Sequence, residues 1–192
     1  MALVNLTRNL IVESAMEILR SFGLGDMTMR RVATHLGVAP GALYWHIANK
    51  QELVSAIAER ILEPVLAAPA VPAADQPDPV AYCGQLREVL LSHRDGAEIV
   101  AGALAQPASP LRGALEHRLS EVLAALSADN RVATTGASAI VHLLLGACVQ
   151  EQSRQQFAEV TGAVEASSTS DARAAIDEQV ALLLTGITTT RP

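Results

Sequence analysis

The sequence predicts an all-α fold, and three observations lead to that prediction. Apolar residues recur at intervals of three and four through most of the 192 residues, which is the period of an amphipathic helix. Capping residues and prolines mark the ends of the expected helices. The alternation of apolar and polar residues that indicates a strand is missing from the sequence. Half of the residues are apolar, so one or two compact domains can bury a sizeable core.

The first helix is expected from about Thr7 to Phe22, where the helical period is strong. Its charged side should face solvent and consists of Glu13, Glu17 and Arg20. Its apolar side should face the core and consists of Leu10, Ile11, Ala15, Ile18, Leu19 and Phe22.

Two short helices joined by a turn are expected between Thr28 and Lys50, where the chain reads TMRRVATHLGVAPGALYWHIANK. Thr28 can cap the first of these helices, and Gly37 can end it. Pro40 fits the first position of the second helix, because its missing N–H would have no helical partner there.

In the second short helix, Leu43 and Ile47 should point inward, which leaves Tyr44, Trp45 and His46 near the surface. The competing interpretation makes these rings ordinary packing residues of a helical bundle. The chain has only five aromatic residues, however, and two of them are adjacent here. Their position outside the expected core favours a surface that contacts a partner.

The distribution of charge favours nucleic acid as that partner. Arg30 and Arg31 belong to the first short helix, Lys50 follows the second, and no acidic residue occurs between Asp26 and Glu52. The net charge is −6, but residues 1–62 carry six Lys and Arg against five acids, whereas residues 63–192 carry eight against fifteen. Only the first part can tolerate a polyanion, and it must do so through the local placement of its basic residues.

A fourth helix is expected from Asn49 to Leu62, with Asn49 and Glu52 in the spacing of a capping box. Pro64 should end this helix. Five prolines between residues 63 and 79 are typical of a semi-rigid connection. The domain boundary is therefore expected near its start, which divides the chain into residues 1–62 and 63–192.

Further helices are expected in the second part, each bounded by capping residues or prolines. They should run from about residue 78 to 93, 95 to 107, 109 to 126, 132 to 157 and 171 to 184. Asp95 and Glu98 stand in the spacing of a second capping box.

A cytoplasmic location is expected. Cys83 and Cys148 lie 65 residues apart in apolar surroundings. This pattern indicates two buried free thiols in a reducing compartment and not a disulfide. The start of the chain lacks a secretory signal. Residues 132–150 carry no charge and approach the roughly 20 residues of a membrane span, but polar residues such as His142 interrupt them. A buried helix is therefore expected, and no membrane.

No catalytic motif or metal-ligand cluster is present in the sequence, so an enzyme is not expected. Two histidines keep two interpretations each. His142 is either a hydrogen-bonded core residue or a ligand contact, and His117 beside Arg118 belongs either to a solvated face or to a pocket.

The segments TMRRVATHLGV, ALYWH and NK resemble the tetracycline-repressor (TetR) family of bacterial transcription regulators. The segment LLSHRDGA and the surroundings of His142 with Gly146 are similar to its tetracycline-sensing branch. The resemblance covers most of the chain and implies a homodimer. Residues 1–62 would be a helix-turn-helix DNA-binding domain, and residues 63–192 a regulatory domain for ligand binding and dimerisation.

The function that the resemblance implies is a transcriptional repressor that a small molecule releases from an inverted-repeat operator in double-stranded DNA, without a cofactor. Two alternatives remain. One is a helical carrier or enzyme that binds a small apolar molecule and no DNA. The other is a regulator whose pocket is vestigial and which responds to a partner protein.

The expected DNA contacts surround the second short helix. Those near base edges are Arg30, Gly41, Ala42, Tyr44 and His46, and those near phosphates are Thr28, Trp45 and Lys50, with Pro40 at the start of the helix.

The expected effector is a mostly apolar molecule with one polar end. Compared with the tetracycline-sensing branch, Val100 and Leu66 stand where that branch has histidines, so magnesium tetracycline and a metal site are not expected. Tyr82 and His142 would hold the polar end. The resemblance implies a pocket lined by Leu66, Tyr82, Leu86, Val100, Ala103, Arg118 and His142.

The dimer is expected to form through a four-helix bundle of residues 132–150, the last helix and their copies. The last helix would contribute Ile176, Val180, Leu183 and Leu184, and Gly136, Ala139 and Gly146 would allow close backbone approach.

Overall fold

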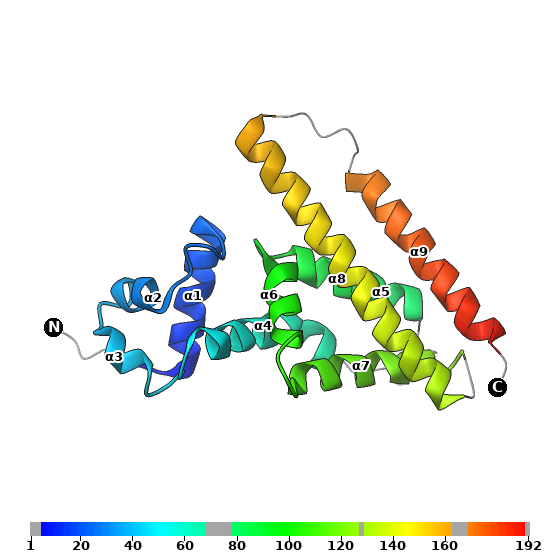
Figure 1. Ribbon diagram of the computed structural model, residues 1–192, viewed down its shortest axis with the longest axis horizontal. Coiled ribbons are helices and arrows are strands. Elements are labelled where there is room, and N and C mark those ends of the chain that lie inside the picture. The colour runs from blue at the N-terminus through cyan, green and yellow to red at the C-terminus, as the bar shows by residue number, and fades with distance from the viewer. Residues whose placement is uncertain (1–4, 68–77, 127–128, 163–168, 191–192) are drawn as a thin grey trace.

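The computed structural model describes residues 5–67, 78–126, 129–162 and 169–190, which form nine helices and no strand (Figure 1). The expected all-α fold is confirmed. In chain order the helices are α1 (Arg8–Phe22), α2 (Met29–His35), α3 (Pro40–Leu43), α4 (Lys50–Ala67), α5 (Pro79–Leu91), α6 (Gly96–Leu104), α7 (Pro110–Leu123), α8 (Asn130–Thr161) and α9 (Thr169–Thr189). Parts of the expected connections, at residues 68–77, 127–128 and 163–168, lie outside the described residues.

The helices form two groups joined by α4. In Figure 1, α1–α3 lie at one end, and α4 runs from them into the group of α5, α6 and α7. The long helix α8 crosses that second group, and α9 returns beside α8 in the opposite direction. Because α4 packs against α1 at one end and against α5, α6 and α7 at the other, it connects the two groups mechanically as well as covalently. The division at residues 62 and 63 stays a prediction.

Side-chain caps begin three of the helices, and the sequence predicts those at Asp78 and Asn49. The side chain of Thr7 accepts a hydrogen bond from Leu10 N at 3.2 Å in α1, and the carboxylate of Asp78 accepts from Val80 N at 2.9 Å in α5. Asn49 Oδ1 accepts from the backbone N–H of Glu52 at 2.9 Å before α4. These side chains replace partners that the first N–H groups of a helix lack.

The expected end of α4 at Pro64 is wrong, because the helix continues to Ala67. Pro64 lies on the exposed side of α4, so the carbonyl that loses its helical partner can be hydrated. Val65 on the other side is 1% exposed. Burial of that side maintains the helix through the proline. The last helix is also longer than expected, since α9 runs from Thr169 to Thr189.

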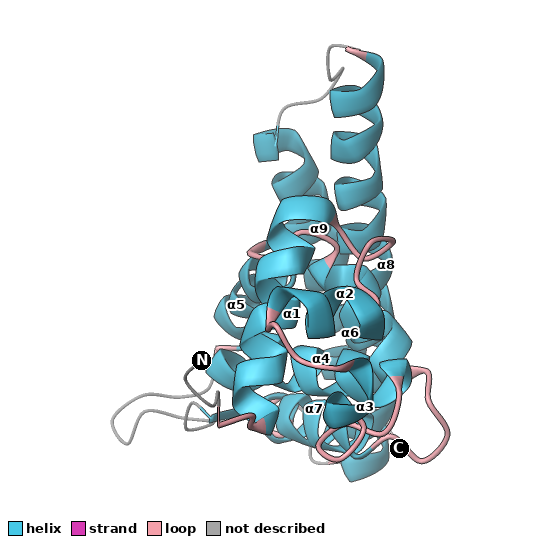
Figure 2. Cartoon of the chain, turned by 90° about the vertical axis from the view of Figure 1, so that its left-hand side faces the viewer, coloured by secondary structure: helices cyan, strands magenta, loops and turns pink. Residues whose placement is uncertain are grey.

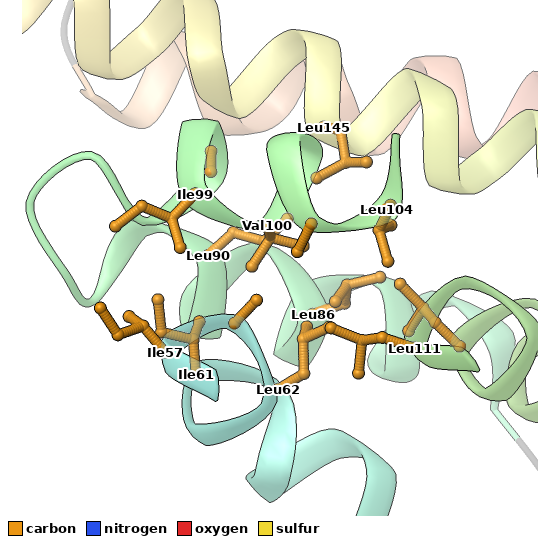
Figure 3. Close-up of a cluster of buried hydrophobic side chains, with 14 of the residues drawn as sticks. Ile57, Ile61, Leu62, Leu86, Leu90, Ile99, Val100, Leu104, Leu111 and Leu145 are labelled. Atoms are coloured by element: carbon orange, nitrogen blue, oxygen red, sulfur yellow. The ribbon is translucent and has the colours of Figure 1, made fainter. Parts of the chain in front are cut away.

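A buried apolar cluster ties α4 to the second group. Figure 3 shows its side chains pointing toward one another from α4, α5, α6, α7 and α8. The labelled members are Ile57, Ile61, Leu62, Leu86, Leu90, Ile99, Val100, Leu104, Leu111 and Leu145. Each such side chain contributes about 1.5–3 kcal/mol by leaving water. Any change in the packing of α5 or α6 therefore acts directly on α4.

α8 has the length and composition of a membrane-spanning helix, as the uncharged stretch in the sequence indicated. One side of it, including Ile140, Leu144 and Cys148, is buried against the rest of the chain. The expected buried helix is therefore confirmed. Cys83 and Cys148 are both free and buried, and burial raises the pKa of each thiol to about 12.

Candidate functional site

The helix-turn-helix is built by local interactions that the sequence predicts. The hydroxyl of Thr28 accepts from Arg31 N at 3.2 Å and caps α2. Gly37 follows α2 with a φ of 67°, a conformation that glycine adopts without strain. Pro40 occupies the start of α3, and Leu43 and Ile47 are fully buried beneath it.

The second helix is shorter than expected. α3 ends at Leu43, and Tyr44, Trp45 and His46 form a turn in which His46 N and Ile47 N both donate to Leu43 O at 2.9 Å. The turn keeps Ile47 in the core and directs the three preceding side chains outward. The surface position expected for these side chains is confirmed.

Trp45 is the most exposed large apolar side chain of the described residues, at 89%, and Tyr44 is 52% exposed. Ordinary packing within one chain is therefore the wrong interpretation of Trp45. The remaining expected DNA contacts are exposed or half-buried. They lie on α2 and its cap, on α3 and the turn after it, and at the start of α4; they are Thr28, Arg30, Pro40, Gly41, Ala42, His46 and Lys50. Figure 2 looks onto this end of the molecule.

Arg31 does not share this surface role. Its guanidinium lies 2.5 Å from a carboxylate oxygen of Asp26 and 3.9 Å from the ring centroid of Phe22. The inward position expected for Phe22 is wrong, since its side chain is 51% exposed and is covered on one face by Arg31. A cation over an aromatic face is attracted by the ring quadrupole. Arg30 of α2 and Lys50 of α4 are then the basic residues that remain for this surface.

The residues expected to line a pocket lie mostly in the core of the second group. Leu86, Val100 and Ala103 are 1%, 0% and 1% exposed, and Leu66 is half-buried at the end of α4. Leu86 and Val100 belong to the cluster in Figure 3. A ligand among them would have to displace apolar side chains from one another.

Tyr82 and Arg118 are the polar members of the expected pocket that meet in this region. The Tyr82 hydroxyl lies 3.5 Å from Val65 O in α4 and is hydrogen-bonded by Arg118 of α7. Burial raises the pKa of Tyr82 to about 12, and the nearby Arg118 charge opposes that shift. The phenol therefore stays neutral at physiological pH and can donate a hydrogen bond.

His142 is not buried in the single chain. It is exposed and lies outside the buried stripe of α8 that contains Val141, Leu144 and Leu145. The core-histidine interpretation is therefore wrong, and ligand contact stays a prediction. His117 has a side chain that is 77% exposed, so the solvated face is the correct interpretation of that residue.

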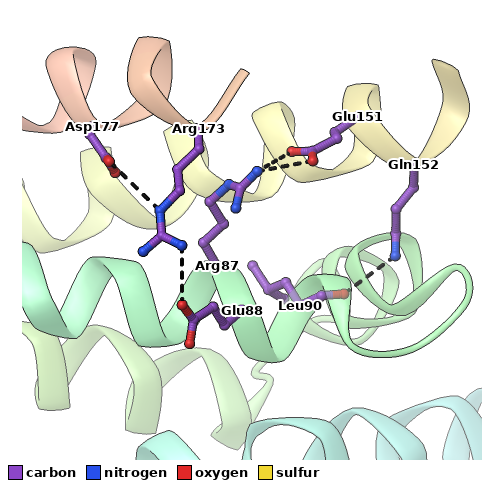
Figure 4. A network of polar contacts seen from close by, with 7 residues as sticks. All are labelled: Arg87, Glu88, Leu90, Glu151, Gln152, Arg173 and Asp177. Carbon is purple, nitrogen blue, oxygen red and sulfur yellow. Dashed lines mark hydrogen bonds and ion pairs between the residues drawn. The ribbon is translucent and has the colours of Figure 1, made fainter. Parts of the chain in front are cut away.

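The motifs and periodicity of the sequence do not predict the buried polar contacts between α5 and α8 (Figure 4). Arg87 Nη2 lies 2.9 and 2.7 Å from the two carboxylate oxygens of Glu151. One residue further along α8, Gln152 donates to His93 O at 2.8 Å and accepts from Ala97 N at 3.1 Å. One signal in the sequence is Arg87, which follows Leu86 on the apolar side of α5. A charged residue at such a position indicates a buried partner of opposite charge.

The prediction of a second capping box at Asp95 and Glu98 is wrong. Asp95 adopts a φ of 55°, and its side chain makes no cap to α6. Instead, Asp95 Oδ2 accepts from Leu24 N at 2.6 Å, and Oδ1 accepts from the amide of Gln156. Tertiary contacts 71 and 61 residues away have replaced the local partner that Glu98 would have provided.

The expected dimer surface of α9 needs correction. Ile176, Val180 and Leu184 are 6%, 2% and 9% exposed, because this stripe packs within the chain. Gly136 serves the same intrachain contact, since a Cβ there would lie 2.5 Å from Ile187 Cδ1. The residues left for a second copy are those on the outer side of the two helices, including Leu182, Leu183, Ala139, His142 and Gly146.

Metal ligands do not gather in the part of the chain that the structure describes. No group of three or more His, Cys, Asp or Glu side chains in it could hold a metal ion. The site that the geometry offers is a polar protein surface with exposed rings, above a core that contains one buried phenol.

Two family models match this chain. The model described as "Bacterial regulatory proteins, tetR family" matches residues 11–57, which contain the helix-turn-helix. The model described as "Tetracyclin repressor-like, C-terminal domain" matches residues 72–189.

Individual relatives extend over most of the chain. The tetracycline repressor protein class A from transposon 1721 of Escherichia coli is 34% identical over 181 residues, which are 91% of this chain and 82% of that protein. The crystal structure of Mycobacterium smegmatis BioQ is 33% identical with a TM-score of 0.81, over 96% of this chain and 98% of that one. A structure of BioQ with its double-stranded DNA operator is 32% identical with a TM-score of 0.78, over 97% and 100%.

Proposed function

Since this chain belongs to the TetR family of bacterial regulatory proteins, we propose that its exposed α2–α3 surface reads an inverted-repeat operator in double-stranded DNA. The protein is a ligand-responsive repressor of this family and acts as a homodimer. The observation that carries the operator surface is Trp45, which is 89% exposed next to the exposed Tyr44 and stands in the sequence between the basic residues Arg30 of α2 and Lys50 of α4. A large apolar ring that is exposed in the free chain marks a surface that a partner covers in the complex.

The residues divide by chemistry. Arg30, Tyr44 and His46 bring hydrogen-bonding groups to base edges, and Gly41 and Ala42 allow close approach and contact with a thymine methyl. Thr28, Trp45 and Lys50 face the phosphates. Phosphate contacts fix the position of the protein on the duplex, whereas base contacts select the sequence.

Repression depends on the separation of two such surfaces. In helix-turn-helix dimers the two reading helices enter successive major grooves about 34–36 Å apart. α4 connects each reading surface to α5 and α6 through Ile57, Ile61 and Leu62. A ligand that binds more tightly to another packing of α5 and α6 lowers the affinity of the protein for DNA. By the same coupling free energy, bound DNA lowers the affinity of the protein for the ligand.

The effector is a small, mostly apolar molecule that enters between α4, α5, α6 and α7. Leu86, Val100 and Ala103 provide its apolar contacts, and Tyr82 with Arg118 offers hydrogen bonds to its polar end. Since these apolar side chains pack against one another, the ligand must separate them. That separation moves α4, which shares their core.

The test of the operator surface is a gel-shift titration on the DNA next to the gene for this protein. A specific shift that competitor DNA of another sequence does not abolish, with a footprint over an inverted repeat, would support the function. Absence of any sequence-specific complex at low salt would overturn it, because weak salt screening is the condition most favourable to DNA binding. We place the protein in the cytoplasm, where its DNA lies.

A further inference from the structure

A hydrogen bond outside α4 joins the DNA-binding end of the chain to the regulatory end. Leu24 lies in the turn between α1 and α2, and its N–H donates to Asp95 Oδ2 at 2.6 Å. Asp95 lies in the turn between α5 and α6 and is 8% exposed. The acceptor is a carboxylate, which makes a stronger bond than a neutral oxygen.

The turn that carries Asp95 is itself fixed to α8. The amide of Gln156 donates to Asp95 Oδ1. Gln152, one helical turn earlier, donates to His93 O at 2.8 Å and to Leu90 O at 3.4 Å, and accepts from Ala97 N at 3.1 Å. Two side chains of α8 therefore hold both sides of this turn, and Figure 4 shows the bond to Leu90.

Two glycines at this place leave no room for a larger side chain. Gly23 has a φ of 81°, and a Cβ there would lie 2.9 Å from Asp95 Oδ2. At Gly96 a Cβ would lie 2.6 Å from Leu90 O. Asp95 keeps a φ of 55° between these glycines, a conformation that costs free energy and persists where the surroundings enforce it.

We propose that Asp95 is a positioning residue, which fixes the DNA-binding end of each protomer relative to α8 and thereby sets the separation of the two reading surfaces. A rigid body attached through α4 alone can rotate about that helix, and a second attachment through Leu24 removes the rotation. This inference rests on the proposed function. It adds a determinant of operator spacing that makes no contact with DNA or effector.

The test uses two variants of the full-length protein and one control. Asp95→Gly removes the acceptor and keeps the positive φ without strain. Gln156→Ala leaves Asp95 in place and removes its support from α8. Gln155→Ala changes the neighbouring glutamine, which lines the same small cavity beside His93 and Asp95. Each protein is titrated with operators whose half-sites are one or two base pairs closer or further apart, and with a single half-site.

Wild type should prefer one spacing, and Asp95→Gly should reduce that preference by about tenfold or more, equivalent to roughly 1.4 kcal/mol. Gln156→Ala should reduce it in the same direction, and Gln155→Ala should leave it unchanged. Affinity for the single half-site should stay the same in all four proteins. A merely structural role would instead weaken all DNA complexes together.

The possible failures are distinguishable. If wild type binds no inverted repeat, the proposed function is wrong and this inference falls with it. If wild type prefers one spacing and both variants keep the same preference, the inference alone is overturned. Should Asp95→Gly fail to fold, Gln156→Ala decides the question, because it changes no backbone conformation.

Discussion

Arg87 and Glu151 form an ion pair that is buried between α5 and α8, with their side chains only 7% and 5% exposed. Arg87 donates to both carboxylate oxygens, which satisfies the charge of Glu151, but Arg87 Nε has no hydrogen-bond partner among the described residues. Two charges that leave water together are stable only as long as each keeps the other. The pair therefore fixes α5 on α8, next to the glutamines that hold the α5–α6 turn.

Removing one partner of this pair should destabilise the protein strongly. Glu151→Ala leaves a buried guanidinium without a counter-charge and should lower the free energy of unfolding by about 3–5 kcal/mol. Denaturant unfolding measures the change. The exposed pair of Arg173 and Glu88, 3.5 Å apart, is the control, and Glu88→Ala should cost at most about 1 kcal/mol. Equal losses in the two variants would contradict the role of burial.

Substitution of the exposed surface should affect DNA and not the fold. Trp45→Ala should change the free energy of unfolding by less than about 0.5 kcal/mol, because the ring contacts little of its own chain. It should nevertheless weaken the operator complex. Leu43→Ala is the contrasting variant, since Leu43 is fully buried and its loss should cost about 2–5 kcal/mol. An operator affinity unchanged by Trp45→Ala would remove this residue from the interface.

Lys50 offers a measurement of its own, because it is the only lysine of the chain. Lys50→Ala should weaken binding to all DNA sequences alike and reduce the slope of log affinity against log salt by about 1. Operator DNA should also protect this amine from a lysine-specific reagent. Labelling at the same rate with and without operator would show that the lysine does not face the phosphates.

Acid should destabilise the protein through His93. Burial, aided by the charge of Arg20, lowers the pKa of this histidine below its ordinary value of 6.5. As the pH falls below 6.5, His93 becomes protonated in the unfolded chain but stays neutral in the folded protein. The free energy of unfolding therefore decreases until the pH reaches the pKa of His93 in the folded protein. His93→Gln should remove this part of the pH dependence. The exposed His117 is the control, and a His117→Gln variant should retain the full acid loss.

Magnesium should have no influence on the binding of the effector. Val100 and Leu66 are apolar and cannot coordinate a cation, and no cluster of metal ligands occurs in the described part of the chain. Titration of magnesium into the operator complex with tetracycline measures this directly. A release of DNA that requires both tetracycline and magnesium would show that the apolar pocket is the wrong interpretation.

Local rules explain which parts of the fold the sequence predicts well. The caps at Thr28 and Asp78 and the turn at Gly37 depend on residues within a few positions, so their partners can be read directly. The exposed rings follow from the same local geometry, because a buried Leu43 and Ile47 leave the intervening side chains no inward direction.

Distant contacts explain the rest. Asp95 has a capping partner in its own helix, yet it bonds to Leu24 and to Gln156, which the sequence places far away. Phe22 follows the apolar period of α1 and still lies outside, because Arg31 covers it from α2. Periodicity predicts the apolar stripe of α9, but it cannot tell whether such a stripe meets its own chain or a copy.

The single tryptophan of the chain is also its most exposed large ring. Its fluorescence emission should therefore be that of an indole in water, with no second tryptophan to obscure it. Burial against a phosphate backbone would change both the wavelength of that emission and its quenching by iodide. The protein thus carries its own optical probe at the surface where the operator is expected, and binding could be followed in solution without a dye.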